Sequence, residues 1–405
     1  MTILEYKANI KQLFGKMSMS KMSQVSTDTP SSQNRLNSYF QWMAIAFLVY
    51  LLISSVGMIG AGFKGATKGH ASELFQFATN PFMGLIIGIL TTAMVQSSST
   101  VTSIIVGLVA GGLPVETAVP MIMGANIGTT ITNTIVSLGH VRRKKEFRRA
   151  FAAGTVHDFF NFLAVVIFLP LEIVFQPLSK IAGFLAENLV GGENMSVKGL
   201  NFIKPATKPI INFFTDISHL ISDSIGYFIL IIFGILIIFM AITLIGKFLK
   251  VLMVGRAKII MHNAIGKGPV TGILSGMIIT ILVQSSSTTT SLMVPLAGSG
   301  VFRLKQIYPF TLGANIGTTI TALLAATAIS GPTAVLTLQI AVVHFLTNAT
   351  AVILIYSVKI LRNLPLRGAL WLARLASENK LVAILYVFGA FFIFPAVLIF
   401  ITNIF

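Results

Sequence analysis

The sequence predicts an all-α integral membrane protein made of two inverted structural repeats, each with transmembrane helices and a re-entrant helical hairpin that carries QSSS. The first observation is composition: of 405 residues, 55% are hydrophobic and only 10% are charged, and the mean hydropathy is +0.86. A soluble domain has about 25% charged residues. The second observation is a set of apolar runs near the ~20 residues of a spanning helix, at 41–62, 225–246, 334–357 and 381–402.

The third observation is internal repetition, which indicates two copies of one structural unit. Three motifs occur twice, 187 to 189 positions apart: VQSSST at 95–100 and 283–288, GANIGTTIT at 124–132 and 313–321, and His-x-x-x-Asn at His157/Asn161 and His344/Asn348. The first repeat is therefore expected at 41–190 and the second at 225–402.

Loop charge predicts the topology. The net charge of +17 comes from basic clusters between apolar runs, such as RRKKEFRR at 142–149, which is typical of cytoplasmic loops and not of nucleic-acid binding. Residues 1–40 are expected to form a flexible cytoplasmic arm, and 191–224 a short extracytoplasmic loop. The first run then leads outward and the run at 225–246 leads inward, so the repeats are inverted. The C-terminus is expected in the periplasm.

The hairpins are expected at about 81–113 and 269–300, around the QSSS motifs. Pro81 to Val95 and Thr100 to Leu113 are only 15 and 14 residues long. At ~1.5 Å per residue, neither arm crosses a ~30 Å hydrocarbon core. A single span with a polar middle is the alternative. The hairpin is favoured because it places the later basic clusters on the cytoplasmic side.

A polar hairpin tip can bind ions. The second arm begins with free N–H groups that attract an anion, and the first ends in free carbonyls that attract a cation. Inverted repeats bring such sites together near the bilayer midplane. The alternative is that the serines are helix-packing residues. The duplication favours a site for an oxyanion and small cations.

GANIGTTIT combines packing and polar residues. Gly-x-x-x-Gly by default indicates close helix packing. Asn126, Thr130 and Asn133 share one helix face, and their oxygens suit a hard cation. The second copy has Asn315 and Thr319 but Ala322 in the third place, so the two cation environments need not be equal.

Asp158 lies inside an apolar run. An intramembrane carboxylate indicates a functional site. A structural pair with a neighbouring His or Arg is the alternative. His157 and His344 are expected to be hydrogen-bonded packing residues.

The two QSSST hairpins, the GANIGTT helices, FRRAFAAGTVHDFFNFLAVVIFLPLE (147–172) and LQIAVVHFLTN (338–348) resemble the type II sodium-dependent phosphate cotransporters over roughly 80–400. The resemblance implies uptake of inorganic phosphate with sodium ions by alternating access, in a bacterial inner membrane and without a cofactor. By position, the phosphate ligands would be Ser97, Ser98, Ser99, Ser285, Ser286 and Ser287. The sodium ligands would be Gln96, Asn161, Gln284, Thr318 and Thr321, to which the motif analysis adds Asn126 and Asn315. Asp158 matches the aspartate of electrogenic members.

Departures from the family pattern put some ligands in doubt. Ala314 stands where animal proteins tend to have Ser, His140 and Arg143 replace a Gln and an Asp, and Gly154 replaces an Ala. Other interpretations also stay open, because sequence fixes neither direction nor coupling ion: a phosphate or organic-anion exporter, a proton-coupled carrier, or a non-transporting scaffold. An enzyme is not indicated, because the sequence has neither an HExxH motif nor an evident catalytic Ser–His arrangement.

Overall fold

The computed structural model describes residues 32–67, 80–191, 203–220, 223–265, 267–327, 329, 331–397 and 400. The chain divides into two compact units, 1–44 and 45–405. The described part of the first unit is the beginning of helix α2 (Ser32–Thr67). The expected arm at 1–40 falls mostly outside the described residues. All that follows concerns the second unit.

The elements of the described residues are helices, which confirms the predicted all-α class. In chain order after α2 they are α4 (Pro81–Val95), α5 (Ser98–Ala110), α6 (Val115–Thr129), α7 (Ile131–Leu138), α8 (Lys144–Phe175), α9 (Pro177–Gly191), α10 (Ile203–His219), α11 (Asp223–Ala264), α12 (Pro269–Val283), α13 (Ser286–Ser291), α14 (Met293–Gly298), α15 (Leu304–Ala326), α16 (Ala334–Ser357), α17 (Lys359–Glu378), α18 (Lys380–Phe388) and the π-helical turn η3 (Gly389–Ile393).

Six helical stretches of the described residues are long and apolar enough to cross a membrane: Tyr39–Thr67, Lys144–Phe175, Ile225–Leu249, Leu304–Ala326, Ala334–Ser357 and Lys380–Val397. Four of them correspond to the predicted runs. The chain is therefore a multi-pass membrane protein. The helices around each QSSS motif are shorter, as the sequence predicts: α4, α5 and α12 have 13 to 15 residues.

Local signals explain where α4 ends and α5 begins. Pro81 occupies the first turn of α4, and the Asn80 side chain accepts a hydrogen bond from Phe82 N. Gln96 ends the helix with φ 59°, a left-handed conformation that costs a non-glycine residue of order 1 kcal/mol or more. Ser97 then returns to extended backbone and caps α5.

The second motif repeats this geometry. Pro269 begins α12, Gln284 ends it with φ 55°, and Ser285 in extended backbone caps α13. The two QSSS copies, 188 residues apart, therefore form the same helix–break–helix tip. The second arm is less regular, because the helix is interrupted at Leu292 between α13 and α14.

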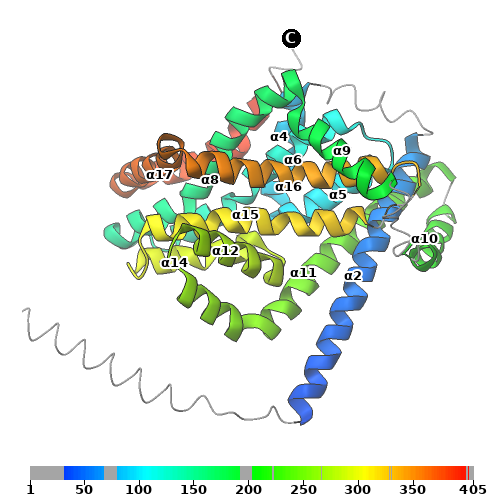
Figure 1. Ribbon diagram of the computed structural model, residues 1–405, viewed down its shortest axis with the longest axis horizontal. Helices are drawn as coiled ribbons and strands as arrows, with labels where there is room; N and C mark the ends of the chain where they lie inside the picture. Colours follow the sequence, from blue (N-terminus) through cyan, green and yellow to red (C-terminus); the bar gives the residue numbers. More distant parts are fainter. Residues whose placement is uncertain are drawn as a thin grey trace, which may run out of the picture. The chain divides into compact units, whose positions relative to one another are not determined.

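Glycines hold each first arm against the helix that carries GANIGTTIT. α4 packs on α6, and α12 packs on α15 (Figure 1). A Cβ added to Gly124 would lie 2.0 Å from the Leu85 carbonyl oxygen, and one added to Gly313 would lie 1.8 Å from that of Ile273. Only glycine permits this approach, which confirms the packing interpretation of the Gly-x-x-x-Gly motif.

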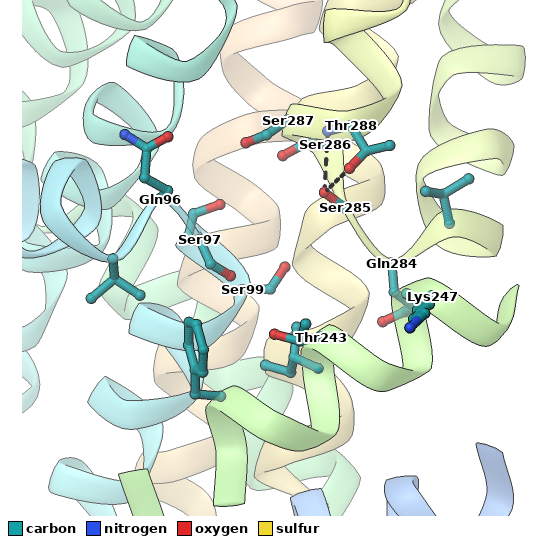
Figure 2. Close-up of a pocket in the computed structure, with 16 residues that line it drawn as sticks. Gln96, Ser97, Ser99, Thr243, Lys247, Gln284, Ser285, Ser286, Ser287 and Thr288 are labelled. Atoms are coloured by element: carbon teal, nitrogen blue, oxygen red, sulfur yellow. Dashed lines mark hydrogen bonds between the residues drawn. The ribbon is translucent and has the colours of Figure 1, made fainter. Parts of the chain in front are cut away.

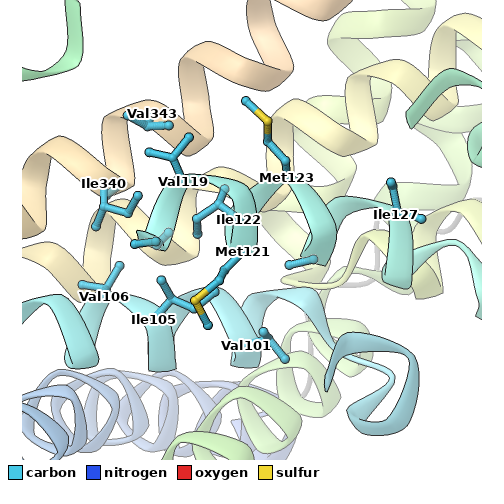
Figure 3. Close-up of a cluster of buried hydrophobic side chains, with 14 of the residues drawn as sticks. Val101, Ile105, Val106, Val119, Met121, Ile122, Met123, Ile127, Ile340 and Val343 are labelled. Atoms are coloured by element: carbon cyan, nitrogen blue, oxygen red, sulfur yellow. The ribbon is translucent and has the colours of Figure 1, made fainter. Parts of the chain in front are cut away.

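A dry core lies where α5, α6 and α16 meet. Val106 of α5, Ile122 of α6 and Ile340 of α16 are fully buried and belong to one cluster of apolar side chains (Figure 3). α6 and α16 come from different predicted repeats, so this core joins the two halves of the chain.

Two segments differ from expectation. Residues 191–224, expected to be a short loop, contain α10. The helix expected at 225–246 continues to Ala264. Its first part is apolar and its last turns are basic, so the apolar run alone did not reveal the full helix.

Candidate functional site

The two QSSS tips line one cavity of about 400 Å³. Residues 95–99 from the first tip and 283–288 from the second line it, together with five residues of α11. In Figure 2 the labelled serines of the first tip, Ser97 and Ser99, lie across this space from those of the second, Ser285, Ser286 and Ser287. Thr243 of α11 lies at one end of the space, and Lys247 of α11 lies beside Gln284. All six serines predicted as phosphate ligands, and both glutamines, are therefore brought together.

The first serine of each tip is a helix cap. Ser97 Oγ accepts a hydrogen bond from Thr100 N at 3.3 Å and lies 2.8 Å from Thr100 Oγ1. Ser285 Oγ accepts from Thr288 N at 3.1 Å and donates to Thr288 Oγ1 at 3.0 Å. These hydroxyls stabilise the tips and are less available to a ligand than their neighbours.

The remaining serine hydroxyls are not engaged. Those of Ser98, Ser99, Ser286 and Ser287 make no hydrogen bond with any residue that the structure describes, yet all four residues line the cavity. Ser98 is 4% exposed and Ser286 is 3% exposed. Buried hydroxyls without protein partners, aimed at one cavity, are the donors that an oxyanion needs.

Each glutamine is held by the last threonine of GANIGTTIT. Gln96 Oε1 accepts from Thr132 Oγ1 at 3.1 Å, and Gln284 Oε1 accepts from Thr321 Oγ1 at 3.0 Å. Both Nε2 atoms donate back to a carbonyl of the preceding helix. Sequence reasoning named Thr321 but missed Thr132, although its identical place in the repeated motif is a signal that could have found it.

Sequence reasoning also missed Lys247 and Thr243. In the sequence Lys247 follows an apolar run, which is the pattern of a loop cation. In the structure α11 continues past it, and Lys247 lines the cavity beside Gln284 (Figure 2). This places a cation at the edge of a site rich in hydroxyls.

The predicted asparagine ligands lie outside this cavity, in a buried polar network. Asn315 Oδ1 accepts from His157 Nε2 at 2.6 Å, and Asn315 Nδ2 donates to Asn161 Oδ1 at 2.7 Å. Asn161 Nδ2 in turn donates to the carbonyl oxygen of Asn126 at 2.8 Å. The oxygens proposed for sodium thus already accept hydrogen bonds.

The other half of the network mirrors the first. Asn126 Oδ1 accepts from His344 Nε2 at 3.2 Å, and Asn126 Nδ2 donates to Asn348 Oδ1 at 3.4 Å. In each half, the His-x-x-x-Asn helix of one predicted repeat bonds the GANIG asparagine of the other. The expectation that His157 and His344 are hydrogen-bonded packing residues is confirmed.

Two further motif residues bond locally or across helices. Thr318 Oγ1 donates to the Ala314 carbonyl one turn earlier, at 3.1 Å. Asn133 Oδ1 accepts from Thr290 and Ser291 at 2.9 Å each, which ties α7 to the second tip.

Asp158 is fully buried in α8, away from the QSSS cavity. Its Oδ2 accepts from Thr134 Oγ1 at 3.0 Å and from Tyr386 Oη at 2.9 Å. Its Oδ1 has no partner among the described residues, and none of the described basic side chains pairs with it. The alternative of a structural pair with His or Arg is therefore not what the structure shows. A buried carboxylate with only hydroxyl partners suits a cation.

A family model matches the regions that build this arrangement. The Na+/Pi-cotransporter family matches residues 51–185 and 235–363, which hold both tips, both GANIGTTIT helices and the polar network. The chain belongs to the Na+/Pi-cotransporter family.

Curated relatives agree with the family model. Sodium-dependent phosphate transport protein 2B of Bos taurus is 34% identical over 443 residues, covering 88% of this chain and 64% of the bovine protein. The 2B protein of Homo sapiens is 33% identical, covering 87% of this chain and 64% of its own length. The 2A protein of Rattus norvegicus is 33% identical, with 87% and 66% covered. The chain thus spans slightly under two thirds of these relatives. No solved structure matches it.

Proposed function

We propose that this protein carries inorganic phosphate into the cell together with sodium ions. The observation that carries the proposal is the meeting of two QSSS tips in one cavity, with four serines whose hydroxyls have no partner among the described residues; Ser98, Ser99 and Ser286 are buried and Ser287 is half-buried. Membership of the Na+/Pi-cotransporter family and the names of the relatives, which are sodium-dependent phosphate transport proteins, support the same substrates.

Phosphate fits the tip chemistry. Hydroxyls and backbone N–H groups at a helix N-terminus donate to phosphate oxygens, and the partial positive charge of that terminus attracts the anion. Ser98 and Ser99 lie in the first turn of α5. Lys247 contributes a full positive charge at the edge of the cavity. In this proposal Ser98, Ser99, Ser286 and Ser287 bind phosphate directly, whereas Ser97 and Ser285 hold the tips in shape.

Sodium is proposed to bind near the tips and at Asp158. Gln96 and Gln284 each bring a carbonyl oxygen beside a threonine hydroxyl. Asp158 brings a carboxylate oxygen without a partner among the described residues. Carboxylate, amide and hydroxyl oxygens are suitable ligands for hard cations. Asn126, Asn161, Asn315 and Thr318 would bind sodium only after exchanging one of their present hydrogen bonds.

The proposed membrane arrangement has two inverted repeats with re-entrant hairpins, in a bacterial inner membrane with the N-terminus in the cytoplasm. The matching backbone of the two tips supports it. So does the cross-bonding of His-x-x-x-Asn and GANIG between the two halves. Alternating access to the site between the repeats would then couple phosphate uptake to the sodium gradient.

Uptake of radiolabelled phosphate into proteoliposomes tests the proposal. An inward sodium gradient should drive accumulation, and an equal potassium gradient should not. Accumulation driven by a proton gradient alone would indicate a proton-coupled carrier. Efflux without sodium-driven uptake would indicate an exporter. No phosphate movement under any gradient would contradict the proposal.

A further inference from the structure

A second cavity, of about 560 Å³, lies away from the QSSS site and is strongly basic. Four cationic side chains line it: Lys145, Arg148, Arg149 and Arg303. The first three come from the beginning of α8, and Arg303 immediately precedes α15. The cavity is therefore assembled from both halves of the chain.

These cations lack a counter-charge among the described residues. None of the four forms an ion pair with a carboxylate of the described residues. Glu146, their sequence neighbour, pairs with Arg143 at 2.8 Å and lies 3.9 Å from His140. The carboxylate nearest in the sequence is thus engaged elsewhere.

Their position adds to the positive potential. The cavity touches the first turns of α8 and α15, through Lys145 and Leu304. Helix N-termini carry partial positive charge, so cations are unfavourable there unless an anion binds. The four like charges around this cavity also repel one another, and a bound anion would relieve that repulsion.

The turn after α14 is shaped to admit an arginine. Gly300 has φ +82°, and a Cβ added there would lie 2.5 Å from Arg149 Nη1. The bare backbone of Gly300 therefore lets the Arg149 guanidinium cross from α8 to the end of the second hairpin. α14 and α17 both pack on α8.

The rest of the lining is apolar. Phe302 and Leu304 contribute from one side, and Leu370 of α17, which is 45% exposed, contributes from the other. The volume falls within the ~300–1,000 Å³ of small-molecule sites. Guanidinium groups in numbers are the residues that recognise phosphate groups, by bidentate hydrogen bonds.

We propose that this cavity binds a phosphate-bearing anion, with the phosphate group among the four cations. The ligand is either the headgroup of an anionic phospholipid, whose acyl chains would contact the apolar lining, or a soluble phosphate ester. The site is separate from the transport cavity, and the inference does not depend on the proposed function. In the proposed topology it faces the cytoplasm, where basic pockets between helices bind lipid headgroups.

The test compares two pairs of substitutions with equal change in charge. Arg148→Gln with Arg303→Gln removes one cation from each side of the cavity. Arg142→Gln with Lys305→Gln removes two exposed neighbours that do not line it. Phosphatidylglycerol and phosphatidylcholine are titrated onto the full chain in detergent, and bound lipid is measured by native mass spectrometry. Glycerol 3-phosphate is tested in parallel through the unfolding temperature.

We expect the parent and the control pair to bind phosphatidylglycerol in preference to phosphatidylcholine. The cavity pair should lose about 30-fold in affinity, which is the conversion of ~1 kcal/mol for each of two cations. Leu370→Glu, which adds a carboxylate at the rim without removing a cation, should lose affinity too. It keeps the test decisive if the cavity pair does not fold.

The outcomes separate the sources. Binding of phosphatidylglycerol alone, lost in the cavity pair, supports a lipid headgroup. Stabilisation by glycerol 3-phosphate, lost in the cavity pair but kept in Ser98→Ala with Ser286→Ala, supports a soluble phosphate ester. The proposal would be overturned if the cavity pair and the control pair lost equal affinity, or if the parent bound no anion. These cations would then serve only to set the orientation of the chain in the membrane.

Discussion

Substituting successive serines of one tip should separate capping from phosphate binding. Ser97 and Ser98 are adjacent and line the same cavity, but their hydroxyls differ. That of Ser97 accepts from Thr100 N, whereas that of Ser98 has no partner among the described residues. We expect Ser97→Ala to weaken the fold and Ser98→Ala to weaken phosphate binding.

The magnitudes follow from these contacts. Loss of a serine cap costs typically ~1 kcal/mol. Because the Ser97 bond is long at 3.3 Å, the cost should lie at or below that value. In a chain of this size, ~1 kcal/mol lowers the unfolding temperature by a few degrees at most. A hydrogen bond to a charged ligand contributes ~1.5–3 kcal/mol, so Ser98→Ala should weaken phosphate affinity roughly 10- to 100-fold.

Two measurements on each variant are needed. Sodium-driven phosphate uptake into proteoliposomes gives the apparent affinity, and thermal unfolding in detergent gives the stability. Ser103→Ala is the matched control, because Ser103 is a buried α5 serine that does not line the cavity. If Ser97→Ala lowers phosphate affinity as much as Ser98→Ala and leaves stability unchanged, the division of roles is wrong.

Three further predictions address the other polar and packing sites. Asp158→Gly should still move phosphate but lose its response to an imposed potential, which contributes ~2.3 kcal/mol per charge per 100 mV; potassium–valinomycin potentials measure this, and retained voltage dependence would rule out a charge-setting role. Gly313→Ala should lower the free energy of unfolding by ~1–3 kcal/mol or more, and with it the unfolding temperature, because the added Cβ would lie 1.8 Å from a carbonyl oxygen of α12. Gly389→Ala is the control: its Cβ would have no neighbour within 4 Å, so the unfolding temperature should not change. His157→Phe should cost ~1–3 kcal/mol by depriving Asn315 Oδ1 of its donor, and His157→Gln should recover part of it, whereas equal stability of both would show that this bond is unimportant.

The tips were largely predictable because their signals are local. Pro81 and Pro269 begin the first arms, and a polar run interrupts each apolar segment after 15 residues. Arms of that length cannot span a bilayer, which favoured a break in the helix at each polar run over one continuous span. The packing role of the GANIGTTIT glycines was equally predictable, because a Gly-x-x-x-Gly motif usually indicates close helix packing.

The roles of the amides were not predictable in the same way. Asn126 and Asn315 have the chemistry of cation ligands, but the motif does not show which groups their side chains bond in the folded protein. Their partners lie 154 to 222 positions away in the chain. Lys247 was missed for a related reason: a cation after an apolar run has the same pattern whether the chain leaves the membrane or the helix continues past a cavity.

The polar network restricts how such a protein can alternate its access. Four hydrogen bonds link α8 and α6 of one half to α15 and α16 of the other, through His157, Asn161, Asn126 and their partners. Pulling these helices apart in a dry interior would leave donors and acceptors unsatisfied, at ~1–3 kcal/mol each, or roughly 4–12 kcal/mol in total. The shared apolar core of α5, α6 and α16 opposes the same separation. If the protein alternates access as proposed, the two tips and this network would move as one body, and access to the cavity would change through elements that border it without joining the network. α11 is such an element, because it lines the cavity with Thr243 and Lys247, and none of its described side chains bonds the buried amides.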